Sequence, residues 1–311
     1  MIIGRMSTSS SITGSVRLSH WGVIRAVGAD AAAFLHGQLT NDFAKLGMDE
    51  ARLAGYCSAK GRLLASFVAW KSAPDEVLLA CHASVLPATL KRLSMFVLRA
   101  KCKLSDATAD VPLFGLAGED AHTGALPMWG KRDVDGGQLI RLPDSTGVAR
   151  ALMASPAVAP PETLPLTTWQ WLDVHSGIAT IEAATVEQFV PQMLNYELVG
   201  GVNFQKGCYP GQEIVARSQY RGTVKRRTFL FDVDASAAAG QEVFNTADPG
   251  QPAGLVAEAA PRPEGPGASA LIEIKLSALD AGSLHLGAPD GPMLHRRELP
   301  YSVAAEADPA T

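Results

Sequence analysis

The sequence lacks the motifs that define several large enzyme classes. It has no G-x-x-x-x-G-K-[S/T] phosphate loop, no H-E-x-x-H zinc helix and no G-x-S-x-G nucleophile turn. ATP hydrolysis, zinc proteolysis and α/β-hydrolase chemistry therefore have no support. A glycine-rich stretch at 265–270 superficially matches a dinucleotide loop. We reject that match because the stretch is rich in proline and no strand leads through it into a helix.

Cysteine is scarce, and positive and negative charges nearly balance. The four cysteines, at positions 57, 81, 102 and 208, form no C-x-x-C pair and have no histidine spacing suited to zinc. We therefore expect reduced thiols in a reducing compartment and no protein-bound metal ion. A net charge of -4 argues against a protein that mainly coats nucleic acid or an anionic membrane. Any anion site must be local.

Long apolar runs are also lacking. The longest, near residues 63–70, is far too short to cross a bilayer, and no apolar h-region follows the first residues. We expect a soluble protein that is not secreted and has no membrane partner. The start of the chain is rich in serine and threonine and has no acidic residue before Asp30. We interpret 1–15 as disordered and the protein as cytoplasmic; the alternative is a transit peptide and the mitochondrial matrix.

Short apolar runs alternate with turn residues through most of the chain. Three strand-like runs, a helix and another strand follow one another between residues 51 and 105, which predicts an antiparallel sheet with its helix on one face. A strand and a helix capped by Asp30, running to Leu39, precede them. This order predicts the α+β class. The predicted strands are 21–27, 51–56, 63–70, 77–81, 101–105, 113–116 and 138–141, and the predicted longer helices are 82–98 and 167–178.

The character of the sequence changes after Gly222. Short strand-like pieces at 226–233, 241–244, 253–259 and 270–276 are separated by turns rich in proline and glycine, which predicts a small all-β barrel or sandwich. The predicted division is a disordered N-terminus (1–15), an α+β region (16–225) made of two units at roughly 16–110 and 111–225, and a β-barrel domain (226–311).

The most informative stretch is K-G-C-Y-P-G-Q-E-I-V-A-R, at 206–217. Pro210 suits the first turn of a helix, and the following residues continue that helix toward Gly222. Cys208 would then precede a helix N-terminus, where unpaired N–H groups, the helix dipole and the adjacent Lys206 favour a thiolate. These features predict a reactive sulfur. The alternative is that Cys208 is a small buried apolar side chain.

Two other polar groups leave alternatives open. The stretch 38–42 places Thr40, Asn41 and Asp42 where a helix ends, which suits either ligand contact or simple capping. Asp173 and His175 are two positions apart on a predicted helix, so they face different directions and a direct acid–base pair is not expected. A basic cluster is interpreted either as a solvated face or as a site for carboxylates or phosphates. Its members are Arg217, Arg221, Lys225, Arg226 and Arg227.

The motif at 206–217, preceded by F-V-P-Q-M-L-N-Y-E and followed by Y-R-G-T-V-K-R-R, resembles the YgfZ family of folate-binding proteins, relatives of the glycine-cleavage T-protein. The resemblance extends from about Trp21 to the last strands. It implies a T-protein-like fold, with a folate-binding region of ferredoxin-like units and a C-terminal β-barrel around a central channel. It also implies a role in assembly or repair of iron–sulfur enzymes, including tRNA methylthiolation, with tetrahydrofolate or a derivative as the cofactor.

The resemblance also implies roles for single residues. Cys208 is the functional thiol, with Lys206 beside it. Asp42 belongs to a stretch that resembles the N-terminal signature of T-proteins. Asp173 lies roughly where T-proteins place an acidic residue against the pterin, whose amino and ring N–H groups a carboxylate accepts. The other expected folate contacts are Gln192, Asn195, Tyr209, Gln212 and Glu213, with Arg217, Arg221 and Arg226 available for the glutamate tail.

One position departs from the T-protein pattern. T-proteins follow the corresponding glycine turn with two small apolar residues and a pair of aspartates, one of them catalytic. Here Ala65 and Ser66 follow G-R-L-L, and neither side chain moves a proton as a carboxylate does. Aminomethyl transfer is therefore disfavoured, although a folate-dependent one-carbon transferase is kept as the alternative function, and whether the protein is an enzyme is left open.

The expected partners are folate and iron–sulfur client enzymes or assembly factors. A third hypothesis is an RNA-interaction module acting through the cluster at 217–227. The net charge of -4 argues against it, so direct nucleic-acid binding is not expected.

Overall fold

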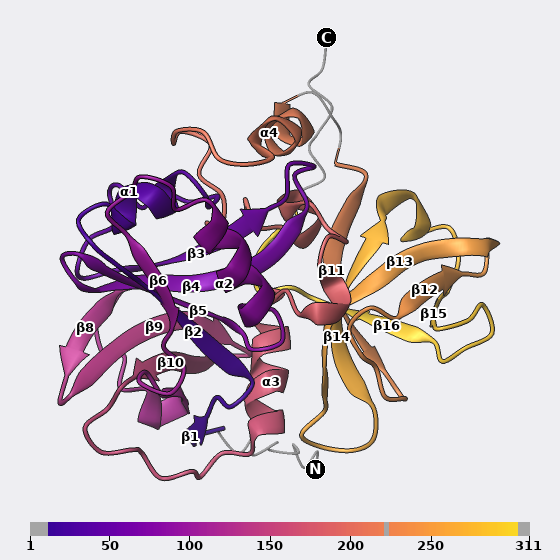
Figure 1. The fold of residues 1–311 in the computed structure, drawn as a ribbon. Helices are drawn as coiled ribbons and strands as arrows, with labels where there is room; N and C mark the ends of the chain where they lie inside the picture. Colours follow the sequence, from indigo (N-terminus) through magenta and orange to yellow (C-terminus); the bar gives the residue numbers. More distant parts are fainter. Residues whose placement is uncertain (1–11, 221–223, 304–311) are drawn as a thin grey trace.

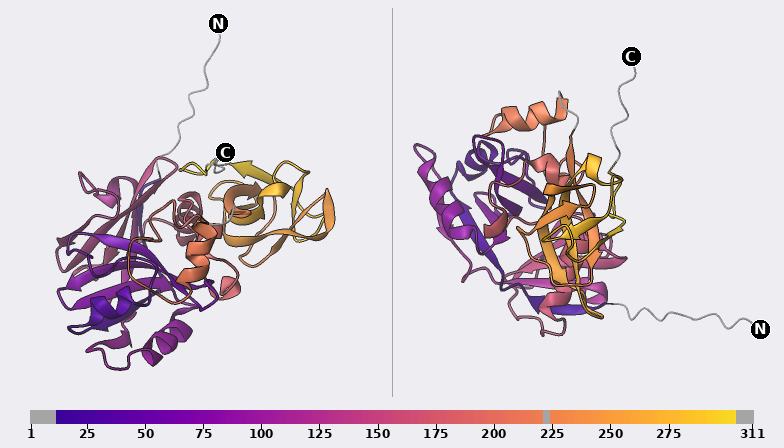
Figure 2. Two further views of the ribbon diagram at one scale, coloured as in Figure 1. Left: turned by 90° about the horizontal axis from the view of Figure 1, so that it is seen from above. Right: turned by 90° about the vertical axis from the view of Figure 1, so that its right-hand side faces the viewer.

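The computed structural model describes residues 12–220 and 224–303 of the 311-residue chain. These residues form three antiparallel sheets: two belong to α+β units that pack on each other, and the third lies beside them (Figure 1). The left view of Figure 2 shows the third sheet to one side of both units, and in the right view it lies in front of them. None of the described helices is both long and apolar enough to cross a membrane.

The first unit contains a five-stranded sheet with two helices on one face. The apolar core on that face includes Phe34 and Leu35 of α1 and Leu86 and Leu93 of α2. Asp30 precedes α1 as predicted, but its side chain makes no capping hydrogen bond to the helix. Its carboxylate instead accepts the N–H of Lys101 at 2.7 Å. The sheet order is β3 (Ala51–Cys57), β4 (Leu63–Ala73), β5 (Glu76–His82), β2 (Trp21–Val27) and β6 (Lys103–Asp106), with α1 at Ala31–His36 and α2 at Leu86–Met95.

The second unit has a five-stranded sheet whose edge comes from the start of the described chain. Gly14 and Ser15 lie in the predicted disordered segment, yet both belong to β1, which pairs with β7. Residues 1–11 of that segment lie outside the described residues. The order is β1 (Gly14–Arg17), β7 (Leu113–Ala117), β10 (Val148–Ala154), β9 (Gly137–Ser145) and β8 (Lys131–Val134), with a 3-10 turn, η1, at Gly118–Ala121.

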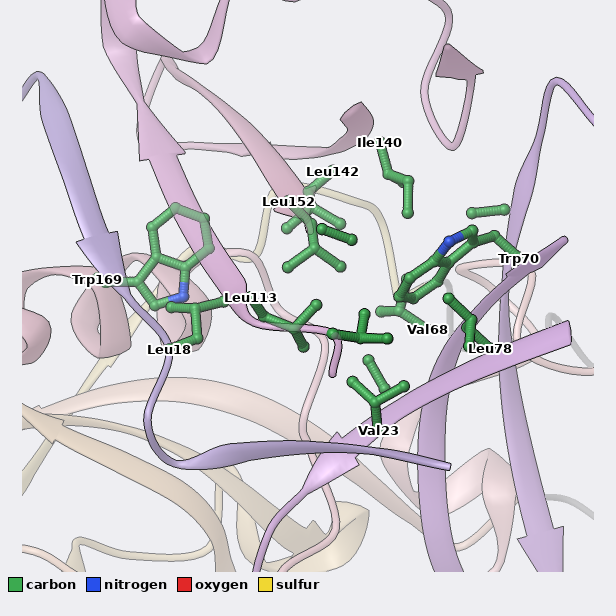
Figure 3. Close-up of a cluster of buried hydrophobic side chains, with 14 of the residues drawn as sticks. Leu18, Val23, Val68, Trp70, Leu78, Leu113, Ile140, Leu142, Leu152 and Trp169 are labelled. Atoms are coloured by element: carbon green, nitrogen blue, oxygen red, sulfur yellow. The ribbon is translucent and has the colours of Figure 1, made fainter. Parts of the chain in front are cut away.

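The two units share one apolar core. Val23 and Ile24 are neighbours on β2 and point to opposite faces, so Val23 enters the shared core while Ile24 packs under the helices of the first unit. In Figure 3, Trp70 and Trp169 lie at opposite sides of the shared core, with Leu152 between them. The first sheet is therefore buried on both faces, which explains why β3, β4 and β5 are almost continuously apolar.

The third sheet curls, so that its two edges approach each other at one point. A bridge between His285 and Met293 connects β15 to the residue before β16, which gives a half-barrel. The predicted α+β class with a C-terminal β-barrel is confirmed. The sheet order is β15 (Leu284–Leu286), β12 (Glu242–Asn245), β13 (Asp248–Pro261), β14 (Ala268–Lys275), β11 (Arg226–Val233) and β16 (Leu294–Arg297), with η4 at Leu276–Ala278.

Helix α3 (Leu166–His175) lies between the second unit and the half-barrel (Figure 1). Its Trp169 and Leu172 enter the shared core of the two units, while Val174 packs with residues of the third sheet. Beyond α3 the chain makes 3-10 turns η2 (Ala183–Thr185) and η3 (Pro191–Leu194) and then α4 (Gln212–Tyr220). Because α3 touches all these layers, a side chain on it reaches the centre of the molecule.

Candidate functional site

The motif loop presents Cys208 at the surface. The helix starts at Gln212 rather than at Pro210, so Cys208 lies four positions before the first helical residue, and its side chain is exposed. The interpretation of Cys208 as a buried apolar side chain is therefore wrong. Gly211 makes the turn into α4 with φ +79°, and a Cβ there would lie 2.3 Å from the carbonyl oxygen of Ser58. Only glycine fits this close approach.

Lys206 anchors the loop to the end of α1. Its buried ammonium donates to the carbonyl oxygen of Leu39 at 2.7 Å and to that of His36. It also lies 4.8 Å from the centre of the Tyr209 ring. Loss of hydration lowers the pKa of Lys206 to about 8, against the opposing effects of Asp42 and Cys208. The amine thus fixes backbone as well as adding charge near the thiol.

The stretch 40–42 braces the glycine turn that precedes the motif. The Thr40 hydroxyl donates to the carbonyl oxygen of Gly201 at 2.6 Å and accepts the N–H of Gly55 at 2.7 Å. The amide of Asn41 donates to the carbonyl oxygens of Leu53 and Gly200 at 2.8 and 2.7 Å. These bonds connect β3 to the loop, so the stretch does more than end α1.

Asp42 lies beside this brace and near the end of α1. It is 3.0 Å from Nδ1 of His36 and accepts the N–H of Lys45 at 3.2 Å. Burial by itself raises the pKa of Asp42, but the Lys45 N–H and the His36 ring outweigh it, and the net shift is downward. The carboxylate is thus held ionised by the protein itself. Its predicted role as a folate contact stays a prediction.

Gln192 and Asn195 are fully buried below the motif helix. The Gln192 amide donates to the carbonyl oxygen of Val215 at 2.7 Å, and the Asn195 amide donates to that of Thr228 at 2.8 Å. These bonds join η3 to α4 and to β11. The structure therefore gives both amides scaffold contacts, and their predicted folate contacts stay predictions.

The remaining motif residues divide between surface and interior. Tyr209 is buried, and its hydroxyl has no hydrogen-bond partner among the described residues. Glu213 and Arg217 are exposed on α4, and Gln212 is half-buried at its start. Figure 1 shows α4 at the top of the view, outside the three sheets.

The predicted solvated basic cluster is wrong for two of its members. Arg226 pairs with Glu273 of β14, and Arg227 pairs with Glu197, so both guanidinium groups have carboxylate partners within the chain. The predicted role of Arg226 toward the folate tail stays a prediction. Arg221 lies outside the described residues. The carboxylates come from distant parts of the sequence, so the local run of charge did not reveal them.

A cavity lies where the two α+β units meet α3 and the segment after it. The centres of water molecules can occupy about 50 Å³ of it, and the empty space is about 550 Å³ when open solvent is included. Its walls are mainly aromatic and aliphatic, with a few polar groups, a composition typical of small-molecule sites. The side chains that bear on its chemistry are those of Trp21, Ser66, Trp129, Arg150, Trp169, Asp173, Thr180 and Tyr196.

Asp173 and Arg150 form the charged centre of this cavity. They make an ion pair in which the Arg150 side chain is 2% exposed. The guanidinium also lies 4.7 Å from the centre of the Trp169 ring. Burial raises the pKa of Asp173 to about 6, although Arg150 opposes the shift. His175 instead bonds Ser269 at 3.0 Å, in line with the prediction that Asp173 and His175 do not pair.

Ser66 also lines the cavity, at the position where the T-protein pattern has its aspartate pair. Its hydroxyl accepts the N–H of Ile181 at 2.9 Å, while Ala65 points into the core of the first unit. Neither position supplies a carboxylate. Among the described residues that were predicted as site residues, Asp173 alone lines the cavity, and Cys208 lies on a separate surface. Sequence reasoning missed Arg150 and Trp129, which carry no local motif.

Two α+β units that meet at a central cavity, with a curled C-terminal sheet beside them, define the T-protein class of folds. The structure aligns with the aminomethyltransferase T of the glycine cleavage system from Bartonella henselae with a TM-score of 0.73, covering 94% of this chain and 87% of the other, at 17% identity. The predicted T-protein-like fold is thereby confirmed.

Sequence comparison narrows the class to one family. The chain is 30% identical over 241 residues to the tRNA-modifying protein YgfZ of Photobacterium profundum, covering 71% of this chain and 70% of the relative. It is 28% identical over 312 residues to the tRNA-modifying protein YgfZ of Serratia proteamaculans, covering 94% and 93%. The chain belongs to the YgfZ family. No family model matches it.

Proposed function

We propose that this protein binds tetrahydrofolate or a derivative in the central cavity and supports the assembly or repair of iron–sulfur enzymes, including those of tRNA methylthiolation, through Cys208. The observation that carries the folate part is the buried Arg150–Asp173 pair in an aromatic cavity. The fold of an aminomethyltransferase T and the names of the tRNA-modifying relatives support the same function. We place its action in the cytoplasm.

The cavity residues suit a reduced pterin ring. Trp21, Trp129 and Trp169 offer flat apolar surface, and the Asp173 carboxylate is a hydrogen-bond acceptor for adjacent N–H groups. Arg150 favours the ionised form of Asp173. Bound tetrahydrofolate would supply one-carbon chemistry there. The residues of this chain bind and orient the ring and exclude water from it.

Cys208 has a different task on the surface. An exposed thiol beside an anchored lysine is accessible to a macromolecular partner. One motif cysteine per chain falls short of the ligand set of an iron–sulfur cluster. Among the described residues, no group of three or more histidine, cysteine or carboxylate side chains is placed to hold a metal ion. We therefore propose that the client enzyme or an assembly factor supplies the other ligands, with Cys208 as a redox or cluster-contacting thiol.

The one-carbon transferase alternative has less support. The positions of the T-protein aspartate pair hold Ala65 and Ser66, and the Ser66 hydroxyl is already bonded to the N–H of Ile181. A serine in this position lacks the carboxylate that the T-protein pattern requires. A tetrahydrofolate-dependent product from a methyl- or aminomethyl-bearing substrate would favour this alternative.

The test separates the two parts of the proposal. Cys208→Ala should abolish the support of a client iron–sulfur enzyme in cells but leave tetrahydrofolate affinity unchanged. Cys102→Ala is the matched control, because Cys102 is a half-buried thiol outside the motif. Unchanged client activity in Cys208→Ala cells would refute the role of the thiol. Failure of the wild-type protein to bind tetrahydrofolate would refute the role of the cavity.

A further inference from the structure

The C-terminal end of helix α2 exposes a group of large apolar side chains. Met95 is 67% exposed, Phe96 44% and Leu98 85%. They are three of the ten large apolar side chains that are exposed among the described residues, and the other seven are spread along the chain. Single exposed apolar side chains are ordinary, whereas a contiguous group marks an interaction surface. The core of the first unit does not use this group, because α2 packs there through Leu86 and Leu93.

The same part of the chain is basic. Between Glu76 and Asp106 the sequence has five lysine and arginine residues and no carboxylate, so the rest of the chain carries -9 of a total net charge of -4. One of the five, Arg92, interacts with Tyr56. The other four are exposed and form no ion pair within the part of the chain that the structure describes: Lys91, Arg99, Lys101 and Lys103.

The carboxylates that flank this segment have other partners. Asp30 accepts the backbone N–H of Lys101 at 2.7 Å, and Asp106 accepts the N–H and the hydroxyl of Thr108 at 2.9 and 2.6 Å. The four cations are therefore not neutralised by their neighbours. We call the three exposed apolar side chains and these four cations the α2 patch.

The α2 patch is separate from the cavity and from the motif loop. None of the residues from 91 to 103 lines the central cavity. Figure 1 shows α2 at the front of the first unit, and in both views of Figure 2 the helix lies at the outer edge of the molecule. A large partner can therefore approach the patch without meeting the half-barrel.

We propose that the α2 patch docks a partner protein whose contact surface has apolar side chains flanked by aspartate or glutamate. Met95 and Leu98 gain from burial against apolar groups, and the cations around them require carboxylates for complementarity. This inference does not depend on folate binding or on Cys208. It concerns a third region of the molecule and adds a contact to those of the proposed function.

The composition of the patch favours a protein over RNA or a membrane. Met95 and Leu98 are aliphatic and offer no ring on which bases stack. A helix that lies in a membrane interface has an apolar face along its length, whereas α2 exposes large apolar groups only in its last turn and just beyond it. An extended anionic bilayer would also repel the rest of this chain, which is strongly negative.

The experiment places a photoreactive group in the patch. Benzoylphenylalanine replaces Leu98 in the full-length protein, in the cells to which the protein is native, and mass spectrometry identifies the crosslinked products. Val158, which is 83% exposed before α3, carries the same group as the control. A second pair of proteins adds Lys101→Glu with Lys103→Glu, or the control Lys60→Glu at an exposed turn between β3 and β4. Thermal unfolding checks that each variant folds.

The crosslinked segment and its response to charge decide the outcome. A protein that crosslinks at Leu98 but not at Val158, through a segment with carboxylates and large apolar side chains, supports the inference. The yield should then fall about tenfold with Lys101→Glu and Lys103→Glu and stay unchanged with Lys60→Glu.

Four other results overturn the inference. They are crosslinks to RNA or lipid alone, a protein segment without carboxylates, a yield that the reversed charges do not lower, and no product beyond that of the Val158 control.

Discussion

The ammonium group of Lys206 donates a hydrogen bond to the carbonyl oxygen of Leu39, 2.7 Å away and 167 positions earlier in the chain. The same group bonds the carbonyl oxygen of His36, so it satisfies two acceptors at the end of α1. The cationic residue of the motif is therefore also the link between the motif loop and the first unit.

Removing that amine should destabilise the fold. Lys206→Met keeps the length and apolar character of the side chain but leaves two carbonyl groups without their donor. We expect a loss of about 1–3 kcal/mol in the free energy of unfolding, measured by urea denaturation. Lys91→Met, at an exposed position of α2, is the control and should change it by less than about 0.5 kcal/mol. Equal effects in the two variants would contradict the anchoring role.

The turn before α4 should not tolerate a side chain. Gly211 has φ +79°, and an added Cβ would lie 2.3 Å from the Ser58 carbonyl oxygen. Gly211→Ala should therefore cost about 1–3 kcal/mol and lower the melting temperature. Gly250→Ala is the matched control, because a Cβ there meets nothing within 4 Å. If the melting temperature falls no further in Gly211→Ala than in Gly250→Ala, the loop accommodates the added Cβ without loss of stability, and the prediction is wrong.

The ion pair between Arg227 and Glu197 should matter for stability. Both side chains are nearly inaccessible, at 6% and 5% exposure. Glu197→Gln leaves the guanidinium buried without its countercharge, which should cost about 3–5 kcal/mol. Asp234→Asn breaks the Arg262 pair, whose acid is 73% exposed, and should cost less than about 1 kcal/mol. Urea denaturation of the two variants measures the loss of unfolding free energy in each. Similar midpoints would contradict the expected larger effect of Glu197→Gln.

Local patterns in the sequence predicted much of the fold. Strand β2 coincides with the predicted 21–27, since alternating apolar residues bounded by Gly28 mark a strand without reference to the rest of the chain. Strand β1 was missed because its order depends on pairing with β7, about a hundred positions away. Helix α2 was predicted too long, and the structure ends it at Met95.

The candidate site was predictable only in part, for a similar reason. The motif around Cys208 is contiguous, so its residues identify it. The cavity is assembled from β4, β10 and α3, and the pairing of Arg150 with Asp173 joins two residues that share no motif. The basic run at 225–227 shows the opposite error: Arg226 and Arg227 are adjacent in sequence, but their partners lie elsewhere, in Glu273 and Glu197.

The Arg150–Asp173 pair should impose a measurable pH dependence on stability. Burial raises the pKa of Asp173 from 3.8 to about 6, so between these values the folded protein binds more protons than the unfolded chain. The contribution of this group to stability is therefore full below the lower value and declines as pH rises toward the upper one.

Asp173→Asn removes this titration and leaves Arg150 without its partner. Relative to the wild type, the variant should lose least stability near pH 6 and most near pH 4, because only the wild type gains from protonation as pH falls. Asp135→Asn, at an exposed position in the turn between β8 and β9, is the control. Urea denaturation of the three proteins across that range gives the differences. If the stability difference between the wild type and Asp173→Asn is constant with pH, the pKa of Asp173 is not raised in the folded protein. That result would contradict the assignment of Asp173 as a buried carboxyl group at the cavity.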